Sequence, residues 1–538
     1  MSKDKSNKAF KVAIGYPPIQ SDKGVPLLSQ NRQFQYFNAP TYVYPMVPAY
    51  AASLIKSKGY EVVWMDGIAE KKTFDEWMQE LEDEKPDLIM LESKTPVIKI
   101  HWKIVKQIKE RFPNLIIVMV GDHVTYLPVE TLERCPADYI ITGGDYDFLL
   151  LDLVRSIVSG KVLTGGIWGR EENKSIKLGE TATYHEKYWN SGPVDIKHEL
   201  DTLPLIDRDL TKWELYAYEN GNYKYRPGTY MYSGRDCWWG KCTFCIWNFT
   251  LYPFGTYRRF SPERLFEEVK HVVDECGVKE IFDDAGTFYV GAPLKKFCEL
   301  MIESGYNKKV VYSCNMRINA LNKEYCELMK KANFRFILYG LESANQETLD
   351  KLQKGLKVEE IEPCLTEAKK AGLEPHITVM LGYPWETEEM AQNTISLAKK
   401  LFKDGHVDTM QATIVIPYPG SELYKQCLEN KWFVVDPKTY EEFDMRKPVM
   451  SVPFSQERLM ELTQALYSSF FSSQYIFRKI TSIRSWQDVK FLAYSAKKLV
   501  GHLFDFDKNQ TKVSILSPKF WIDAGKSMST HLIPKRKK

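Results

Sequence analysis

The chain has 538 residues, of which 44% are hydrophobic and 27% are charged. This composition is typical of globular proteins and argues against a mainly disordered, collagenous or coiled-coil chain. At roughly 150 residues per domain, the length predicts about three domains. The net charge is +3, but the segment from residue 455 onward carries 15 Lys/Arg against 6 Asp/Glu. We expect a basic tail that is either solvated or in contact with phosphates or an anionic membrane.

The sequence contains no convincing membrane-spanning or secretory segment. Residues 1–8 are polar, which does not fit a secretory signal. The uncharged stretch 462–477 is shorter than the ~20 residues that a helical span requires. We therefore expect a cytoplasmic protein, either free or held peripherally at the inner face of the membrane.

Short apolar runs alternate with helical periodicity over residues 10–155. Strands that are apolar on both faces and separated by helices predict a doubly wound, Rossmann-like α/β domain over residues 1–155. Ligands of such sheets bind beyond the carboxyl ends of the strands. Several polar residues follow these expected ends and form a candidate pocket rim: Asp66, Ser93, Asp122, His123 and Asp145.

The rest of the chain divides into three further regions. Residues 156–228 are weakly periodic and predict a connector. Six strand–helix units over residues 229–430 predict a partial (β/α)6 barrel. Residues 431–538 predict a helical, basic and aromatic region, whose amphipathic helices either pack across the open barrel or lie at a membrane surface.

Three clustered cysteines, Cys237, Cys242 and Cys245, follow the first expected barrel strand. Three thiolates within nine residues can converge on one soft metal centre. A [4Fe–4S] cluster normally takes four cysteines, so three would leave one iron open to a substrate or cofactor. The alternative is a structural zinc site, which needs four closed ligands. No fourth cysteine lies nearby, and the nearest histidines are His198 and His271.

The cysteine loop resembles the signature of the radical S-adenosylmethionine (SAM) superfamily, C-x3-C-x-aromatic-C. Phe244 occupies the aromatic position, although the first gap here has four residues instead of three. Segments 282–288, 340–355, 381–387 and 417–421 are similar, in order, to later strands of that family. The resemblance covers about residues 229–430. It implies a [4Fe–4S] cluster that reduces SAM to methionine and a hydrogen-abstracting 5′-deoxyadenosyl radical.

The resemblance also implies which residues contact SAM. Phe244 would lie against the adenine, and Glu342 would accept hydrogen bonds from the ribose or the ammonium group. Arg317 would match a carboxylate, or alternatively would form a surface salt bridge. Asp284 would contact the cofactor or cap the next helix. The full set of expected SAM-site residues is Phe244, Asp284, Asn315, Arg317, Glu342 and Gly382.

The N-terminal region resembles the cobalamin-binding-domain branch of the same superfamily. Residues 119–128 and 138–145 are similar to its pattern G-x-H…P-x-x-x-L…D-Y-x-x-x-G-E, with Asp145 in place of the usual Glu. This resemblance implies cobalamin as a cofactor and places His123 at its site. The motif D-x-H-x-x-G is absent, so His123 is not expected to bind cobalt and alternatively is a hydrogen-bonded loop histidine.

The overall layout is similar to hopanoid-associated radical SAM proteins and to anaerobic magnesium-protoporphyrin ester cyclases. It implies an enzyme that functionalises an unactivated carbon of a hydrophobic, lipid-like or macrocyclic metabolite, by cobalamin-dependent methylation or by radical cyclisation or rearrangement. We expect a reducing electron donor such as flavodoxin or ferredoxin, and no nucleic-acid partner. The alternative is a non-catalytic iron–sulfur or cobalamin sensor or electron carrier.

Overall fold

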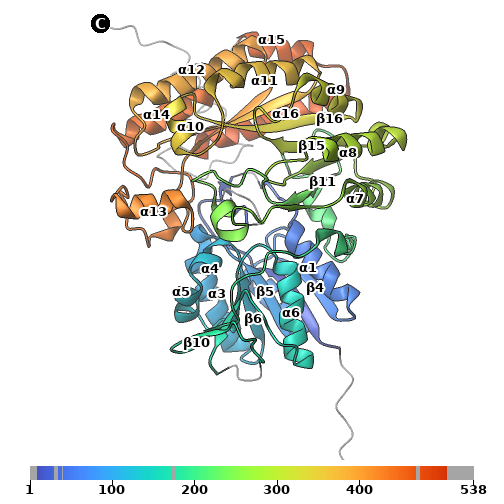
Figure 1. Cartoon of the computed structure of the whole chain (residues 1–538), viewed down its shortest axis with the longest axis vertical. Helices are drawn as coiled ribbons and strands as arrows, with labels where there is room; N and C mark the ends of the chain where they lie inside the picture. The colour runs from blue at the N-terminus through green and yellow to red at the C-terminus, as the bar shows by residue number, and fades with distance from the viewer. Residues whose placement is uncertain (1–8, 29–33, 39, 173–175, 468–472, 506–538) are drawn as a thin grey trace, which may run out of the picture.

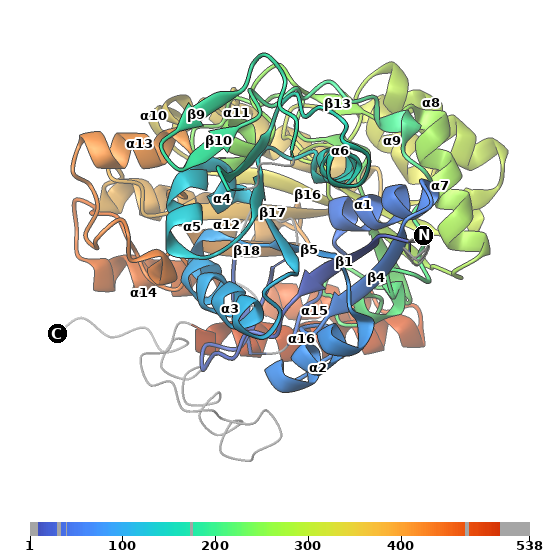
Figure 2. The same cartoon turned by 90° about the horizontal axis from the view of Figure 1, so that it is seen from below.

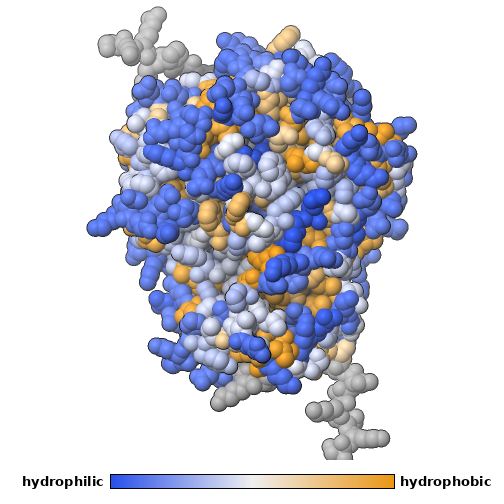
Figure 3. Space-filling view, in the orientation of Figure 1, coloured by the Kyte–Doolittle hydropathy of each residue, from blue (hydrophilic) through white to orange (hydrophobic). Residues whose placement is uncertain are grey.

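The computed structural model describes residues 9–28, 34–38, 40–172, 176–467 and 473–505. Figure 1 shows an N-terminal sheet domain in blue and cyan beneath a barrel domain in green to orange. The face in Figure 3 is largely hydrophilic, with several apolar residues near its middle, where the two domains meet. Among the described residues, no helix is long and apolar enough to cross a membrane.

The N-terminal domain contains the expected parallel sheet. Helices lie on both faces of the sheet, α1 and α6 on one and α2 and α3 on the other (Figure 2). This arrangement confirms the doubly wound fold. The sheet order begins β4-β1-β5-β6-β7, with strands β1 (Lys11–Tyr16), β4 (Glu61–Asp66), β5 (Leu88–Glu92), β6 (Ile116–Val120) and β7 (Tyr139–Ile141) and helices α1 (Met46–Ser57), α2 (Phe74–Glu84), α3 (Ile98–Arg111), α4 (Asp122–Tyr126), α5 (Pro128–Arg134) and α6 (Tyr146–Ser159).

The segment expected to be a connector, residues 156–228, extends this sheet. Strands β8 (Ile167–Arg170), β10 (Tyr188–Asn190) and β9 (Thr183–His185) add to the edge at β7 with antiparallel pairing. These strands have only three or four residues each, too few to give a clear alternating pattern in the sequence. Their pairing is determined by the free edge of β7, which the sequence of the segment does not reveal.

The second domain is a curled, six-stranded parallel sheet, as expected for a partial (β/α)6 barrel. Its order follows the chain from β11 to β18, and β11 and β18 do not pair with each other, so the barrel stays open. The strands are β11 (Gly228–Met231), β14 (Glu280–Asp283), β15 (Val311–Met316), β16 (Phe334–Glu342), β17 (Glu374–Leu381) and β18 (Thr409–Ile414), and the outer helices are α7 (Pro262–Asp274), α8 (Ala292–Glu303), α9 (Lys323–Lys331), α10 (Gln346–Lys351), α11 (Val358–Lys370) and α12 (Glu388–Asp404).

The C-terminal helices close the open parts of the barrel. The Tyr467 hydroxyl, in α14 (Gln456–Tyr467), contacts the amide and carbonyl of Ala412 on edge strand β18, at 3.3 and 2.9 Å. Asp488, in α16 (Trp486–Asp505), pairs with Lys224 at 2.6 Å, just before β11. Helix α14 therefore packs on the edge strand of the barrel, and α16 contacts the segment that leads into β11. Residues 506–538 of the basic tail lie outside the described residues. The remaining helices are α13 (Glu422–Glu429) and α15 (Ser473–Thr481).

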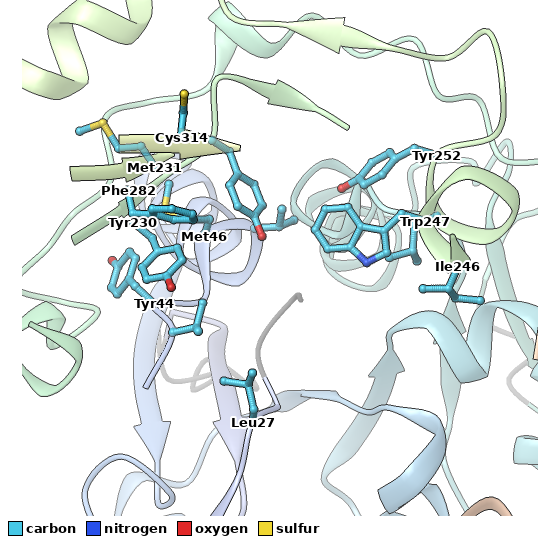
Figure 4. Packing of buried hydrophobic residues seen from close by; sticks show 14 of the residues in the cluster. Leu27, Tyr44, Met46, Tyr230, Met231, Ile246, Trp247, Tyr252, Phe282 and Cys314 are labelled. Atoms are coloured by element: carbon cyan, nitrogen blue, oxygen red, sulfur yellow. The ribbon is translucent and has the colours of Figure 1, made fainter. Parts of the chain in front are cut away.

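A continuous hydrophobic cluster joins the two domains. In Figure 4, Tyr44 and Met46 of the N-terminal domain lie beside Tyr230, Met231 and Phe282 of the barrel. The same view shows Trp247 and Tyr252, which follow the cysteines and pack edge to face with ring centroids 5.9 Å apart. Because buried apolar surface stabilises roughly in proportion to its area, we expect the domains to form one packed body.

Candidate active site

The cysteines lie on a loop between two short antiparallel strands, β12 (Gly234–Arg235) and β13 (Arg258–Arg259). Gly240 has φ +60°, a conformation that L side chains adopt rarely, and it allows the chain to turn between the first two cysteines. All three cysteines line a cavity of about 290 Å³ at the carboxyl ends of the barrel strands. Cys242 is buried, whereas Cys237 and Cys245 are partly exposed.

Most of the residues expected to contact SAM line this same cavity. Beyond the three cysteines, the lining includes Phe244, Asp284, Asn315, Arg317 and Glu342. Gly382 lies outside the cavity: its amide donates to Glu386 Oε2 at 2.7 Å, and a Cβ there would lie 2.8 Å from Leu459 of α14. The structure therefore places Gly382 in a turn against the C-terminal region.

A buried ion pair lies at the side of the cavity. Lys354 Nζ is 2.7 Å from Glu342 Oε1, and both side chains are less than 10% exposed. Burial disfavours the Lys354 charge, but the Glu342 carboxylate outweighs burial and raises the lysine pKa. A Cβ on Gly340 would lie 2.3 Å from the Glu342 carboxylate and 2.6 Å from Lys354 Nζ. Glycine at this position therefore makes room for the pair.

Glu342 also has an unusual backbone conformation. Its φ is +63°, which is strained for a residue with a side chain. The pairing of β16 with β17 is irregular between Gly340 and Glu342. This bulge turns the carboxylate into the cavity, and such strain is most often kept at functional sites.

Arg317 lies between the cysteine loop and the segment after α10. Its Nη2 donates to the Lys354 carbonyl at 2.5 Å, and its guanidinium lies 4.2 Å from the centroid of the Trp239 ring. Burial lowers the Arg317 pKa, an effect that the neighbouring Cys242 and Cys237 partly offset. Arg317 thus places a second cation beside Cys242, and it does not form the surface salt bridge that was one expectation.

Two acidic residues bind backbone or amide groups in the cavity wall. Asn315 Nδ2 donates to Asp284 Oδ1 at 2.8 Å, and the Gly286 amide donates to Asp236 Oδ1 at 2.6 Å. A Cβ on Gly286 would lie 2.7 Å from the Cys237 Cβ. The glycine therefore lets the second barrel strand approach the cysteine loop.

The donor set around the cavity suits a cluster better than one structural zinc ion. The three cysteines line the cavity together with the cations Arg317 and Lys354. Within the described part of the chain, the cavity lining contains no fourth cysteine, whereas a structural zinc site needs four closed ligands. Three thiols beside two cations fit an anionic iron–sulfur cluster with one open iron.

His123 is enclosed and does not line the cysteine cavity. Its ring is fully buried and packs edge to face on Tyr440, with centroids 4.6 Å apart. Its Nδ1 lies 3.2 Å from Thr95 Oγ1, and burial lowers its pKa to about 3. Its Nε2 has no hydrogen-bond partner among the described residues and lies 3.9 Å from Glu130 Oε2, so the hydrogen bonding expected of a satisfied loop histidine is incomplete.

A second cleft, of about 930 Å³, lies between the domains. Most of its lining comes from the carboxyl end of β7, the α4–α5 segment and residues 190–197, and the chain after Cys245 completes it. The cleft contains a few polar groups in a mostly apolar wall, a combination common in cofactor sites. Its lining includes Tyr126, Glu130, Thr142, Gly143, Trp168, Val194, Thr250, Pro253 and Thr256.

Comparison with known families agrees with this arrangement. Residues 37–148 match the family described as "B12 binding domain", and residues 231–398 match the "Radical SAM superfamily". The chain contains a B12-binding domain followed by a radical SAM domain. These matches confirm the expected cofactors: a [4Fe–4S] cluster and SAM for the barrel, and cobalamin for the N-terminal domain.

Curated relatives of this radical SAM protein are enzymes. An uncharacterized methyltransferase of Pyrococcus horikoshii is 27% identical, over 79% of this chain and 87% of the relative. An anaerobic magnesium-protoporphyrin IX monomethyl ester cyclase of Rubrivivax gelatinosus is 24% identical, over 81% of this chain and 76% of the relative. These relatives support an enzyme and disfavour the sensor or electron-carrier alternative.

Solved structures share the fold. The radical SAM methyltransferase TsrM of Kitasatospora setae, solved with cobalamin and a [4Fe–4S] cluster, matches with a TM-score of 0.59 and 13% identity, over 80% of this chain and 76% of that chain. The cobalamin-dependent SAM radical enzyme OxsB, with aqua-cobalamin bound, matches with a TM-score of 0.62 and 14% identity. This match covers 98% of this chain and 76% of the OxsB chain. At this identity the likeness concerns the fold alone.

Lys354 and Arg235 are the main residues that sequence reasoning missed. Lys354 lies inside the segment 340–355 that resembles the family, so the sequence pointed to this segment but not to the role of the lysine. Arg235 lies two residues before Cys237 and binds Asp147 of the N-terminal domain, with Nη2 2.6 Å from Oδ2. Nothing in the sequence indicates this pairing, because its partners are 88 positions apart. Asp145, expected on a pocket rim, binds Arg235, Arg258 and His198 instead.

Proposed function

We propose that this radical SAM enzyme uses cobalamin to methylate an unactivated carbon of a hydrophobic, lipid-like or macrocyclic metabolite. The observation that carries the proposal is the composition of the cavity. Beyond the cysteines, Glu342 and Lys354, the lining combines polar groups such as Asn222, His376 and Gln411 with a set of apolar side chains. A hydrophobic molecule would bury its surface against these apolar side chains, which are Phe282, Met316, Leu338, Met380, Val415 and Ile416.

The chain's own residues hold and orient the reactants. Cys237, Cys242 and Cys245 would hold the cluster, and Glu342, fixed by Lys354, would accept hydrogen bonds from SAM. When bound, the cluster would supply one electron to SAM, and cobalamin would carry the methyl group. The apolar part of the cavity wall would help to keep water away from reactive species.

We propose that cobalamin occupies the 930 Å³ cleft. The cleft lies beyond the carboxyl end of β7, where ligands of doubly wound sheets bind, and it borders the loop that bears the cysteines. His123 is enclosed by Tyr440 and lies outside the lining of the cleft. The proposal therefore leaves cobalt without a histidine ligand from this position.

Product analysis tests the proposed methylation. The anaerobically reconstituted protein is reduced in the presence of SAM, hydroxocobalamin and a hydrophobic extract of the source cells. Methylation predicts both 5′-deoxyadenosine and S-adenosylhomocysteine, because SAM is consumed as radical source and as methyl donor. Formation of 5′-deoxyadenosine without S-adenosylhomocysteine, with activity independent of cobalamin, would remove the methyltransferase proposal.

Radical cyclisation or rearrangement is the second candidate. The relative named as a magnesium-protoporphyrin ester cyclase aligns over most of both chains, which supports this candidate. A product of unchanged carbon count, with loss of hydrogen but no methyl group gained from labelled SAM, would favour this candidate.

We also propose that α15 makes a peripheral contact with an anionic membrane. Its inner side is tied to the barrel by polar groups: Arg478 donates to the Phe402 and Lys403 carbonyls, and Lys479 pairs with Asp408 at 3.1 Å. Its outer side lies at the barrel end of the molecule (Figure 1), and it exposes several apolar side chains beside the polar Gln474 and Thr481. The exposed apolar residues on and after the helix are Ile476 at 44%, Phe477 at 68%, Ile480 at 61% and Trp486 at 70%.

The positive charge of the C-terminal tail favours an anionic membrane, and not a second copy of the chain, as the partner of the exposed side of α15. Residues 506–538 contain eight Lys/Arg and two Asp, so two copies would repel each other whereas anionic headgroups would attract the tail. We expect the protein to sediment with vesicles that contain phosphatidylglycerol and not with pure phosphatidylcholine vesicles. A Phe477→Glu, Ile480→Glu variant should lose this binding. A concentration-dependent dimer that the variant disrupts, without vesicle binding, would contradict the membrane proposal.

A further inference from the structure

The cysteine loop is anchored to the turn between β7 and α6 of the N-terminal domain. The Gly144 amide donates to the Leu251 carbonyl at 3.0 Å, and the Tyr252 hydroxyl donates to the Gly144 carbonyl at 2.9 Å. A Cβ on Gly144 would lie only 2.1 Å from the Tyr252 ring. The turn and the loop are therefore in direct contact immediately after the cysteines.

Two arginines anchor the same loop on either side of the cysteines. Arg235 binds Asp147 through two bonds, of 3.2 and 2.6 Å, and Asp145 through one of 3.2 Å. Arg258 binds both oxygens of Asp145, at 2.7 and 2.9 Å. The Arg235, Asp145 and Asp147 side chains are at most 1% exposed. Paired hydrogen bonds from a planar guanidinium fix direction as well as distance, so the start and end of the loop are held rigidly.

The same turn forms part of the interdomain cleft. Thr142 and Gly143, directly before the anchoring residues, line the cleft. Thr250 and Pro253, from the cysteine loop itself, also line it. A molecule in the cleft would contact both segments, and any shift of the β7–α6 turn would act on Arg235, two residues before Cys237.

We propose that Arg235 is a positioning residue that couples occupancy of the interdomain cleft to SAM binding at the cysteine cavity. The inference rests on the proposed function in one respect, the placement of cobalamin in this cleft. It goes further by assigning the coupling to the contacts of Arg235 with Asp145 and Asp147. Coupling between two binding equilibria is reciprocal, so each ligand should raise the affinity for the other by the same factor.

The test measures two affinities on the full-length, anaerobically reconstituted protein with its cluster left oxidised, so that no turnover occurs. SAM binding is measured by calorimetry with and without saturating hydroxocobalamin, and hydroxocobalamin binding by visible absorption with and without SAM. We expect each ligand to strengthen binding of the other by at least about fivefold, the lower end of usual coupling. The two factors should agree.

Two variants assign the coupling to Arg235. Arg235→Lys keeps the charge but loses the forked geometry, and Asp147→Asn keeps the size but removes the charge of the partner. Both should retain iron and bind each ligand alone, while the coupling factor falls toward one. Arg335→Lys is the matched control, because Arg335 is also buried and binds two carboxylates, Glu280 and Glu374, but within the barrel. The Arg335→Lys variant should keep the wild-type coupling factor between SAM and hydroxocobalamin.

The outcomes separate this inference from the proposed cofactor site. Hydroxocobalamin binding with no coupling in the wild type, or with unchanged coupling in both variants, would overturn the role of Arg235 alone. Absence of hydroxocobalamin binding would overturn the placement of cobalamin and the coupling together. Equal loss of coupling in Arg335→Lys would show a general effect of buried arginines and would also overturn the inference.

Discussion

Lys354 and Glu342 form a buried ion pair, with Nζ and Oε1 2.7 Å apart, at the wall of the cysteine cavity. Both side chains line the cavity, and glycine at 340 leaves room for the pair. Removing one member of a buried pair leaves the other charge uncompensated, which typically costs about 3–5 kcal/mol. This relationship gives two predictions, one electrostatic and one steric.

Glu342→Gln should weaken SAM binding by more than about tenfold, equivalent to about 1.4 kcal/mol, and lower the free energy of unfolding by about 3 kcal/mol. Iron content should stay at the wild-type level, because the cysteines are untouched. Calorimetry with SAM and urea unfolding measure the two effects. Adding Lys354→Met should restore much of the lost stability but not SAM binding. Wild-type SAM affinity in Glu342→Gln would contradict the assigned role.

Gly340→Ala should have the same effect on SAM through shape alone. The new methyl group would overlap the Glu342 carboxylate and Lys354 Nζ, at 2.3 and 2.6 Å. We expect impaired SAM binding with normal iron content. Gly221→Ala is the control, because a Cβ there meets no atom within 4 Å. Equal SAM affinity for the two variants would mean that the ion pair moves aside without consequence.

Cys242→Ala should abolish stable cluster binding. After anaerobic reconstitution, the wild type should hold about four irons per chain and the variant less than half of that. The variant should form no 5′-deoxyadenosine from SAM under reducing conditions. Cys427→Ala, which removes another buried cysteine in α13, should keep both iron and SAM cleavage. Zinc at about one per chain in the wild type would refute the cluster.

The local parts of the site were predictable from the sequence, and the long-range parts were not. The cysteines, Phe244 and Glu342 lie in short segments at strand ends, so a barrel of parallel strands brings them together whatever else the chain does. The Arg235–Asp147 pair depends on how two separate domains pack. Nothing in either segment specifies the other, so this contact required the structure.

The sheet edges and the histidine show the same limit. Strands β8, β9 and β10 are too short to show a period, and they form because β7 offers a free edge. His123 occupied a motif position that suggested a cofactor contact, yet Tyr440, more than three hundred positions later, covers it. Sequence position placed the residue near the correct sheet end but could not show which neighbour would fill the space beside it.

Glu92 should make the stability of the apoprotein depend on pH. Its carboxyl is buried at the end of β5 and accepts a hydrogen bond from the Tyr16 hydroxyl at 2.5 Å. Burial raises its pKa to about 7, whereas the same group in the unfolded chain has its ordinary value near 4.3. The folded state therefore binds the proton more tightly. This stabilising contribution is fully present below about pH 4.3 and is lost as pH rises through about 7.

Glu92→Gln removes this titration while keeping an oxygen for Tyr16. Urea unfolding of both proteins from pH 5 to pH 8 should show the variant gaining relative stability as pH rises. The gain should reach up to about 3 kcal/mol, since each unit of pKa difference is worth 1.36 kcal/mol. Glu110→Gln, on the exposed side of α3, is the control and should follow the wild-type slope. If the stability of Glu92→Gln changes with pH as the wild type does, the pKa of Glu92 does not differ between the folded and unfolded states.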